Sequence, residues 1–228
     1  MNRWTLIGEK ERIRLERIAS FVLVMVGSIT YSQLHQVEMN IMDASYYISI
    51  GDVCFDELGF HISIFPKTFR GCLFPLYLQV LKHSFLGLKF GWSLTTGFIL
   101  ASLFTVIIPS FFHRNDIHKN SAFLTVIPAA IYIFFWGDTL LYPLSDLVAV
   151  FSLISGIWIL LLLVEYKEWS RRKILILSFG SGALLYFTYN TRVIFLYGIL
   201  VSIVVYVISC IKKVSARPPR RGSSALWS

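Results

Sequence analysis

Charge is scarce in this sequence: 15% of the 228 residues are Asp, Glu, Lys or Arg, whereas 56% are hydrophobic. The few charges gather between long apolar runs instead of being spread along the chain. A run of about 20 apolar residues is what a helix needs to cross about 30 Å of hydrocarbon, where all backbone polar groups must be satisfied within the helix. The pattern argues against a soluble globular domain and predicts an all-α, polytopic membrane helix bundle.

Signatures of several enzyme classes are missing as well. The sequence has no Gly-rich phosphate loop, no His-Glu-x-x-His helix and no nucleophile elbow, so nothing in it supports nucleotide-driven or zinc-peptidase chemistry. Its three cysteines, Cys54, Cys72 and Cys210, fit no metal spacing. Cys54 and Cys72 share one polar loop, where they either pair in an oxidising compartment or stay as two free thiols.

Six apolar stretches are long enough, or nearly so, to cross a membrane as helices. They cover residues 18–31, 92–112, 121–136, 144–164, 174–189 and 193–211. We therefore expect residues 1–211 to form one transmembrane module and residues 212–228 to form a basic, disordered tail. A further stretch, residues 73–87, is shorter and includes Pro75, Gln79 and Lys82, so it decides between six and seven spans.

The basic residues predict how the chain is oriented. With six spans, most of the 21 Lys and Arg residues fall on one side, as the positive-inside rule requires of the cytoplasm. These residues are Arg3, Lys10, Arg12, Arg14, Arg17, Arg114, Lys119, Lys167, Arg171, Arg172, Lys173, Lys212, Lys213, Arg217, Arg220 and Arg221. If residues 73–87 cross as well, the later clusters move outside and the bias reverses.

Six spans with a cytoplasmic N-terminus are thus the preferred topology, and seven spans are the alternative. Residues 73–87 then lie on the outer face as an interfacial helix. The net charge of +8 follows the ends of the spans and forms no patch with interleaved aromatics, so its partners are lipid headgroups and not nucleic acid.

In this topology residues 32–91 form a long first extracytoplasmic loop that contains short interfacial helices. The part before residue 72 has an acidic excess, with Glu38, Asp43, Asp52, Asp56 and Glu57 against Lys67 and Arg70. Two of the carboxylates between residues 52 and 57 are spaced to share a divalent cation. Loop carboxylates are more often simply solvated, so no metal ligand is assigned.

Four short elements along the chain resemble the outer-face motifs of GT-C glycosyltransferases. The closest patterns are those of protein O-mannosyltransferases and bacterial lipid A aminoarabinose transferases, which use a sugar carried on a polyprenyl phosphate. The elements are Met42-Asp43-Ala44-Ser45-Tyr46-Tyr47, Arg70-Gly71-Cys72-Leu73-Phe74-Pro75-Leu76-Tyr77, Tyr142-Pro143-Leu144-Ser145-Asp146-Leu147, and Gly180-Ser181-Gly182-Ala183-Leu184 with Thr191-Arg192.

The resemblance implies an inverting transfer of the sugar to an acceptor on the extracytoplasmic face, with Asp43 as the general base. A hydroxyl acceptor is a weak nucleophile that needs a carboxylate to take its proton, and the leaving polyprenyl phosphate needs cations or a metal near its oxygens. Arg70 and Arg192 can hold phosphate by a bidentate fork, and Lys67 can do so as a point charge.

Further assignments follow from the same resemblance. Tyr46 and Tyr47 belong to the Tyr-rich segment after the base and are expected at the substrate site. Asp146 either lines the acceptor pocket or caps its helix, and Arg192 either binds phosphate or extends to lipid headgroups. The expected partners are the lipid-linked sugar donor, membrane lipids and a lipid, glycan or protein acceptor, with a divalent cation as an optional cofactor. The expected location is the bacterial inner (plasma) membrane.

The sequence also departs from the family pattern. Ala44 stands where many relatives have Glu after the Asp, and Trp92-Ser93-Leu94 stands where an Arg is expected near the start of the following span. Complete relatives are considerably longer, so we expect the front part of such an enzyme. The alternatives are a non-catalytic polytopic membrane protein, either an assembly partner or a decayed paralogue, and a transporter or lipid flippase. The last is disfavoured by the few charges within spans and by the lack of an internal repeat. Gly180 and Gly182 are expected to allow close helix packing.

Overall fold

The computed structural model describes residues 3–35, 38, 42–56, 59–60, 71–112, 122–165 and 169–215. These segments are helical except for one antiparallel pairing of two-residue strands, so the expected all-α class is confirmed for them. In chain order the elements are α1 (Arg3–Leu34), α2 (Met42–Cys54), β1 (Phe55–Asp56), β2 (Gly59–Phe60), α3 (Leu73–His83), α4 (Gly87–Ser102), the π-helix η2 (Leu103–Ile107), α5 (Ile108–Phe112), the 3-10 helix η4 (Ala122–Thr125), α6 (Val126–Trp136), α7 (Asp138–Leu141), α8 (Ser145–Glu165), α9 (Arg171–Thr191), the 3-10 helix η5 (Val193–Phe195) and α10 (Leu196–Ser215).

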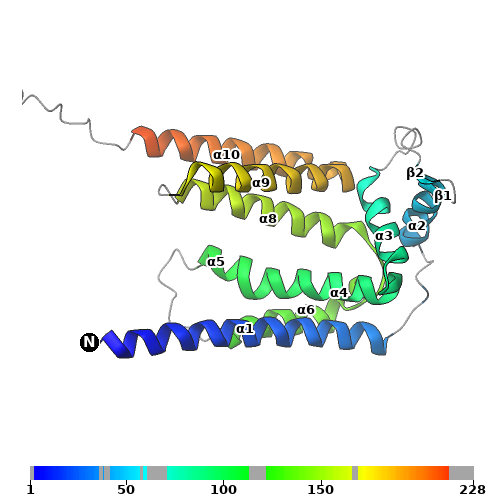
Figure 1. Ribbon diagram of the computed structural model, residues 1–228, viewed down its shortest axis with the longest axis horizontal. Helices are drawn as coiled ribbons and strands as arrows, with labels where there is room; N and C mark the ends of the chain where they lie inside the picture. The colour runs from blue at the N-terminus through cyan, green and yellow to red at the C-terminus, as the bar shows by residue number, and fades with distance from the viewer. Residues whose placement is uncertain are drawn as a thin grey trace, which may run out of the picture.

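The long helices lie side by side, and α2 and α3 are set across one end of them (Figure 1). Helices α1, α4 and α6 form one group, and α8, α9 and α10 form the other. Direction alternates along the chain, so the N-terminus and the end of α10 lie at the end opposite to α2 and α3 (Figure 1). We call the end that carries α2, α3 and the start of α8 the α2–α3 end.

Four helical segments are long and apolar enough to span a membrane: Gly87–Phe111, Ser145–Glu165, Arg171–Thr191 and Val193–Ile211. They match four of the expected spans. The expected span at residues 18–31 is the apolar part of α1, a helix of 32 residues whose first half is charged. The expected span at 121–136 contains α6, an apolar helix of 11 residues. These last two spans stay predictions.

Helix α3 is the segment on which the number of spans depends. Its 11 residues make a helix of about 16 Å at 1.5 Å per residue, roughly half the thickness of a hydrocarbon core. It lies across the end of the bundle and not beside the long helices (Figure 1). Gly87, which has a positive φ of 69°, makes the turn from this helix into α4.

Aromatic side chains attach the end helices to the bundle. Phe74 of α3 packs edge to face on Tyr47 of α2 and on Trp92 of α4, with ring centroids 5.0 and 6.1 Å away. All three rings are buried in one cluster. The indole Nε1 of Trp92 donates to the carbonyl of Leu140 at 3.0 Å, which ties α4 to α7. Trp92, in the stretch where the resemblance to GT-C glycosyltransferases leads us to expect an Arg, is therefore a core residue.

Small residues lie where the long helices approach most closely. A Cβ at Gly97 of α4 would be 3.1 Å from the carbonyl oxygen of Met25 in α1. The hydroxyl of Ser181 in α9 donates to the carbonyl of Gly156 in α8 at 3.0 Å. The expectation for Gly180 and Gly182 is wrong, since no atom lies within 4 Å of where their Cβ atoms would be. Ser181 faces α8, so its two neighbours point away from that contact.

Two expected boundaries shift by a few residues. Helix α1 extends to Leu34 and α4 begins at Gly87, so the segment between them is shorter than the expected residues 32–91. Helix α10 continues to Ser215, past the expected start of the tail at residue 212. Residues 216–228 lie outside the described part of the chain.

Candidate functional site

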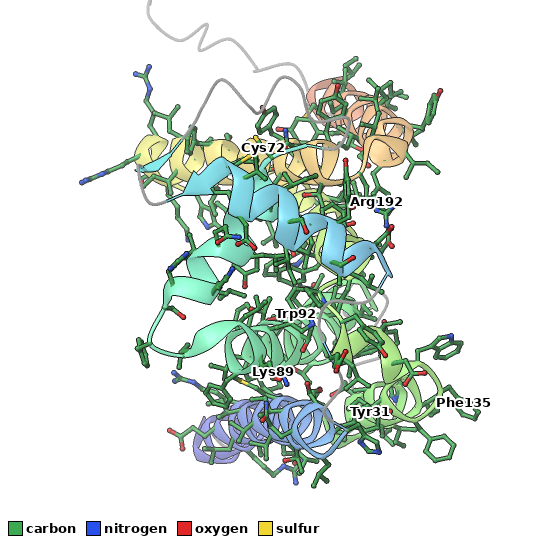
Figure 2. The ribbon with its side chains drawn as sticks, turned by 90° about the vertical axis from the view of Figure 1, so that its right-hand side faces the viewer. Tyr31, Cys72, Lys89, Trp92, Phe135 and Arg192 are labelled. Carbon is green, nitrogen blue, oxygen red and sulfur yellow. The ribbon has the colours of Figure 1, made fainter. Side chains whose placement is uncertain are left out.

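Three of the charged residues singled out from the sequence meet at the α2–α3 end. Asp43 lies in the first turn of α2, Asp146 lies in the first turn of α8, and Arg192 follows α9 directly. A terminal nitrogen of Arg192, Nη2, donates to Oδ2 of Asp146 at 2.8 Å and lies 3.6 Å from Oδ2 of Asp43. Figure 2, which looks onto this end, shows Arg192 close to α2. We call Asp43, Asp146 and Arg192 the arginine cluster.

Local sequence places each member of the arginine cluster at a helix end. Pro143 follows α7 and holds Tyr142 in an extended conformation, so α8 starts afresh at Ser145. Arg192 itself is extended, with φ −147° and ψ 103°, and its backbone N–H closes α9 on the carbonyl of Thr188 at 2.9 Å. The two carboxylates lie in first helical turns, where the helix dipole favours negative charge.

Ser145 joins the arginine cluster to the core. Its side chain is fully buried, and its hydroxyl oxygen accepts a hydrogen bond from Nε of Arg192 at 2.8 Å. The same oxygen lies 2.9 Å from the hydroxyl of Tyr47. The guanidinium is therefore held through two of its nitrogens, and one of the two partners is a fully buried side chain. Ser145 belongs to the Ser-Asp-Leu element of the sequence, but its buried position gave no signal there.

The arginine cluster has one positive charge and two negative ones. The Arg192 side chain is 25% exposed, whereas those of Asp43 and Asp146 are 43% and 58% exposed. Both carboxylates can thus reach a molecule at the surface, while the cation is recessed between them. An arrangement of this kind can accept a proton from a bound hydroxyl and can offer the guanidinium to an oxyanion.

The two tyrosines after the candidate base take different places. Tyr47 is 1% exposed and packs against Phe74, so it positions Ser145 from within the core. Tyr46 is 43% exposed and meets Tyr47 edge to face, with ring centroids 6.0 Å apart. Of the pair, Tyr46 is the residue whose ring can touch a substrate.

The end of α9 also holds the start of α3. The side-chain oxygen of Asn190 accepts a hydrogen bond from the backbone N–H of Leu73 at 2.9 Å. A Cβ at Gly71 would lie 1.6 Å from the backbone oxygen of Asn190, so no residue with a side chain fits there. This contact explains the glycine of the Arg70-Gly71 element, which the sequence alone did not.

Asp52, near the other end of α2, belongs to a separate network. Its Oδ1 accepts hydrogen bonds from Lys82 at 2.6 Å and from the amide of Gln79 at 2.8 Å. Desolvation is the largest single influence and raises the pKa of Asp52. The hydrogen bonds from Lys82 and Gln79, with the charges of Lys82 and His83, outweigh it and leave the pKa below its ordinary value. We call Asp52, Gln79 and Lys82 the lysine cluster.

The remaining candidates have the following positions. Lys67 and Arg70 lie outside the described residues, as does Glu57, and nothing is described of the Asp56 side chain. Within the described part of the chain, no group of three His, Cys, Asp or Glu residues could hold a metal ion. Cys54 and Cys72 are both free thiols. Burial raises the pKa of Cys54, and the neighbouring Cys72 adds to the effect.

Comparison of the chain with models of protein families, with curated proteins and with solved structures finds no match. The resemblance to GT-C glycosyltransferases therefore depends on the four motifs.

Proposed function

We propose that this chain is a membrane glycosyltransferase, or the front part of one, that moves a sugar from a polyprenyl-phosphate carrier to an acceptor at the α2–α3 end. The observation that carries this proposal is the contact of Arg192 with both Asp43 and Asp146. Three of the four motifs supply one member each, although they are widely separated in sequence. Motifs that serve one reaction are expected to meet in this way.

In the proposed reaction Asp43 takes the proton of the acceptor hydroxyl while the new glycosidic bond forms with inversion. The bond from the anomeric carbon to the phosphate oxygen breaks, and the electron pair leaves with the polyprenyl phosphate. Arg192 faces the departing phosphate, and its fixed orientation favours an anion that develops during the reaction. Asp146 holds Arg192 in place and lies near enough to contact the acceptor.

The arginine cluster alone does not neutralise the donor, because its two carboxylates outnumber its single cation. A leaving phosphate adds further negative charge, and catalysis of its departure requires a compensating cation. Lys67 and Arg70 fill this role in the proposal, with a divalent cation as the other source. The lysine cluster does not, since Lys82 is bonded to Asp52.

The topology that fits this proposal has six spans and a cytoplasmic N-terminus. The alternating direction of the long helices puts the basic start of α9 at one end and the arginine cluster at the other. Helix α3 has about half the length needed to cross. Its place across the bundle end is what an interfacial helix would occupy, which favours six spans over seven.

The test measures release of free polyprenyl phosphate, because this product forms whatever the acceptor is. Membranes containing the full chain receive undecaprenyl phosphate that carries mannose or aminoarabinose, with Mg²⁺ and a lipid extract as the source of acceptors. Asp43→Asn keeps the size of the side chain but removes the base, and we expect release to fall by about 100-fold or more.

Asp52→Asn is the matched control, since it makes the same change at the other end of α2. We expect its rate to stay within about threefold of the unmodified protein, because Asp52 is committed to the lysine cluster. Both variants must insert in the membrane in equal amounts. Equal activity in Asp43→Asn and the unmodified protein would remove the assigned base, and no release from either donor would remove the proposed reaction.

A non-catalytic membrane protein is the second candidate, and one observation favours it. Arg192 is hydrogen-bonded to Ser145 and Asp146 of α8 and lies 3.6 Å from Asp43 of α2. The arginine cluster can therefore serve only to hold α2 against α8 and α9. In that case the purified protein binds no undecaprenyl phosphate by native mass spectrometry, and Asp43→Asn changes stability alone.

A further inference from the structure

A hollow lies at the α2–α3 end, away from the arginine cluster. It has a volume of about 720 Å³ and lies between the end of α1 and the start of α4. Its lining residues are Gln33, Glu38, Leu86, Gly87, Leu88, Lys89 and Phe90. Figure 2 shows Lys89 between α4 and α1, on the opposite side of this end from Arg192. The volume is in the range of small-ligand sites.

Two opposite charges line this hollow without neutralising each other. Glu38 and Lys89 both border it, yet among the described residues neither side chain has an ion-pair or hydrogen-bond partner. Leu86, the residue before α4, makes no side-chain capping hydrogen bond, so the free N–H groups of the first turn add to the positive potential near Lys89. The lining thus offers a positive side and a negative side to one ligand.

Gln33 adds an oriented acceptor to the negative side. Its amide nitrogen donates to the hydroxyl of Ser93 at 3.0 Å, and that hydroxyl lies 2.8 Å from Ser32, so the amide is anchored to the α1–α4 contact. The amide oxygen remains available as an acceptor. Glu38 and Gln33 together suit a group with several N–H donors, such as a primary ammonium.

The rim of the hollow is apolar and aromatic. Phe85, in the turn just before the lining residues, is 97% exposed, and Phe90 is 40% exposed. Such exposure is costly in water but ordinary where a membrane protein meets acyl chains and headgroups. The long apolar helix α4 starts at this same rim, so the hollow lies at the level where hydrocarbon gives way to water.

We propose that this hollow binds the headgroup of a phospholipid that carries both a phosphate and a primary ammonium, as in phosphatidylethanolamine. Lys89 binds the phosphate, Glu38 and the Gln33 oxygen accept from the ammonium, and the two phenylalanines lie against the acyl chains. A choline headgroup has no N–H to donate, and a glycerol headgroup has no cation for Glu38. The site is separate from the sugar-transfer site and does not depend on the proposed function.

Selectivity among headgroups is the measurable consequence. The full chain is purified in detergent, and bound lipids are counted by native mass spectrometry with phosphatidylethanolamine, phosphatidylcholine and phosphatidylglycerol of identical acyl chains. We expect at least threefold higher occupancy by the ethanolamine lipid. Glu38→Gln should abolish this preference, whereas Lys89→Gln should lower occupancy by all three lipids. Asp138→Asn, an exposed carboxylate at the same end that does not line the hollow, should leave the preference unchanged.

Equal occupancy by the three lipids in the unmodified protein would overturn the proposal, and so would a preference that survives in both Glu38→Gln and Lys89→Gln. A competition arm separates a lipid site from a site for a soluble ligand. Glycerophosphoethanolamine should displace the lipid only at a concentration at least 100-fold above that of the lipid itself. Displacement at equal concentration would show that the acyl chains contribute nothing and would contradict a lipid as the occupant.

Discussion

Helix α2 carries a carboxylate near each end, and the two have different partners. Asp52 is bonded to Lys82 and Gln79 of α3, the helix that packs directly on α2. Asp43 faces Arg192, which is shared with Asp146 and directly follows α9. One pair is internal to the two end helices, and the other joins them to α8 and α9.

The two clusters differ in the ratio of carboxylates to cations. In the lysine cluster a single carboxylate is matched by a single ammonium at 2.6 Å, so the charges cancel. In the arginine cluster one guanidinium faces two carboxylates, with Asp146 at 2.8 Å and Asp43 at 3.6 Å. A partly exposed carboxylate beside a shared guanidinium can take up a proton from a bound hydroxyl.

The largest effect on stability should come from moving the end helices away from α9. In Gly71→Ala the new Cβ would lie 1.6 Å from the backbone oxygen of Asn190, so the start of α3 must shift. We expect a loss of about 3 kcal/mol or more in unfolding free energy. The lysine cluster should survive because it moves with α2 and α3, whereas Asp43 should move away from Arg192 and Asp146. Tryptophan fluorescence during thermal unfolding in detergent measures the loss of unfolding free energy.

Gly180→Ala is the matched control, because the same methyl group is added to α9 where no atom lies within 4 Å. A helix-interior alanine in open space should be neutral or stabilising by about 0.5–1 kcal/mol. If Gly71→Ala were as stable as Gly180→Ala, the close approach of α3 to Asn190 would be refuted.

Removing the cation from each cluster should lower the unfolding free energy by unequal amounts. Arg192→Gln leaves Asp43 and Asp146 facing each other and removes one of the two polar partners of Ser145, and we expect a loss of about 1–3 kcal/mol in unfolding free energy. Lys82→Gln breaks a pair whose side chains are 41% and 45% exposed, which is worth about 0.2–1 kcal/mol. Adding Asp146→Asn to Arg192→Gln should restore part of the loss by removing one of the two like charges. Equal losses in the two single variants would contradict the distinction between the clusters.

Sequence reasoning could place Asp43, Asp146 and Arg192 at one end of the bundle, since each follows or precedes an apolar run of known length. It could not place them in contact, because hydrophobic periodicity gives the length of a helix and not the neighbour on which it packs. The partners Ser145 and Asn190 were missed for the same reason. Their roles depend on burial against helices that are distant in sequence.

The glycines also show that the sequence does not tell which face of a helix meets a neighbour. Gly180 and Gly182 sit in an apolar span, where a packing role is the natural expectation, yet they face open space. Gly71 and Gly156 make the close contacts, with Asn190 and with Leu185 and Ser181. A pattern of small residues says that close approach is possible, but which face of the helix meets a neighbour depends on the packing of the whole bundle.

The smallest expected effect concerns the pH dependence of the lysine cluster. The pKa of Asp52 is lower in the folded protein than its ordinary value of about 3.9. A depressed pKa stabilises the fold at any pH above the unfolded value, and this contribution is lost as the pH falls through the folded value. The side chain is 45% exposed, so solvent screening keeps the contribution within about 0.2–1 kcal/mol.

The unmodified protein and Asp52→Asn are compared by thermal unfolding between pH 7 and pH 3. The difference between their unfolding free energies should be constant above about pH 5 and should become smaller below about pH 4. Asp138→Asn changes an exposed carboxylate that has no side-chain partner among the described residues, and it should follow the unmodified protein throughout. A difference that stays constant down to pH 3 would mean that the charge of Asp52 is not what Lys82 and Gln79 recognise. The lysine cluster would then be held by packing alone, and the contrast with the charge-rich arginine cluster would be sharper still.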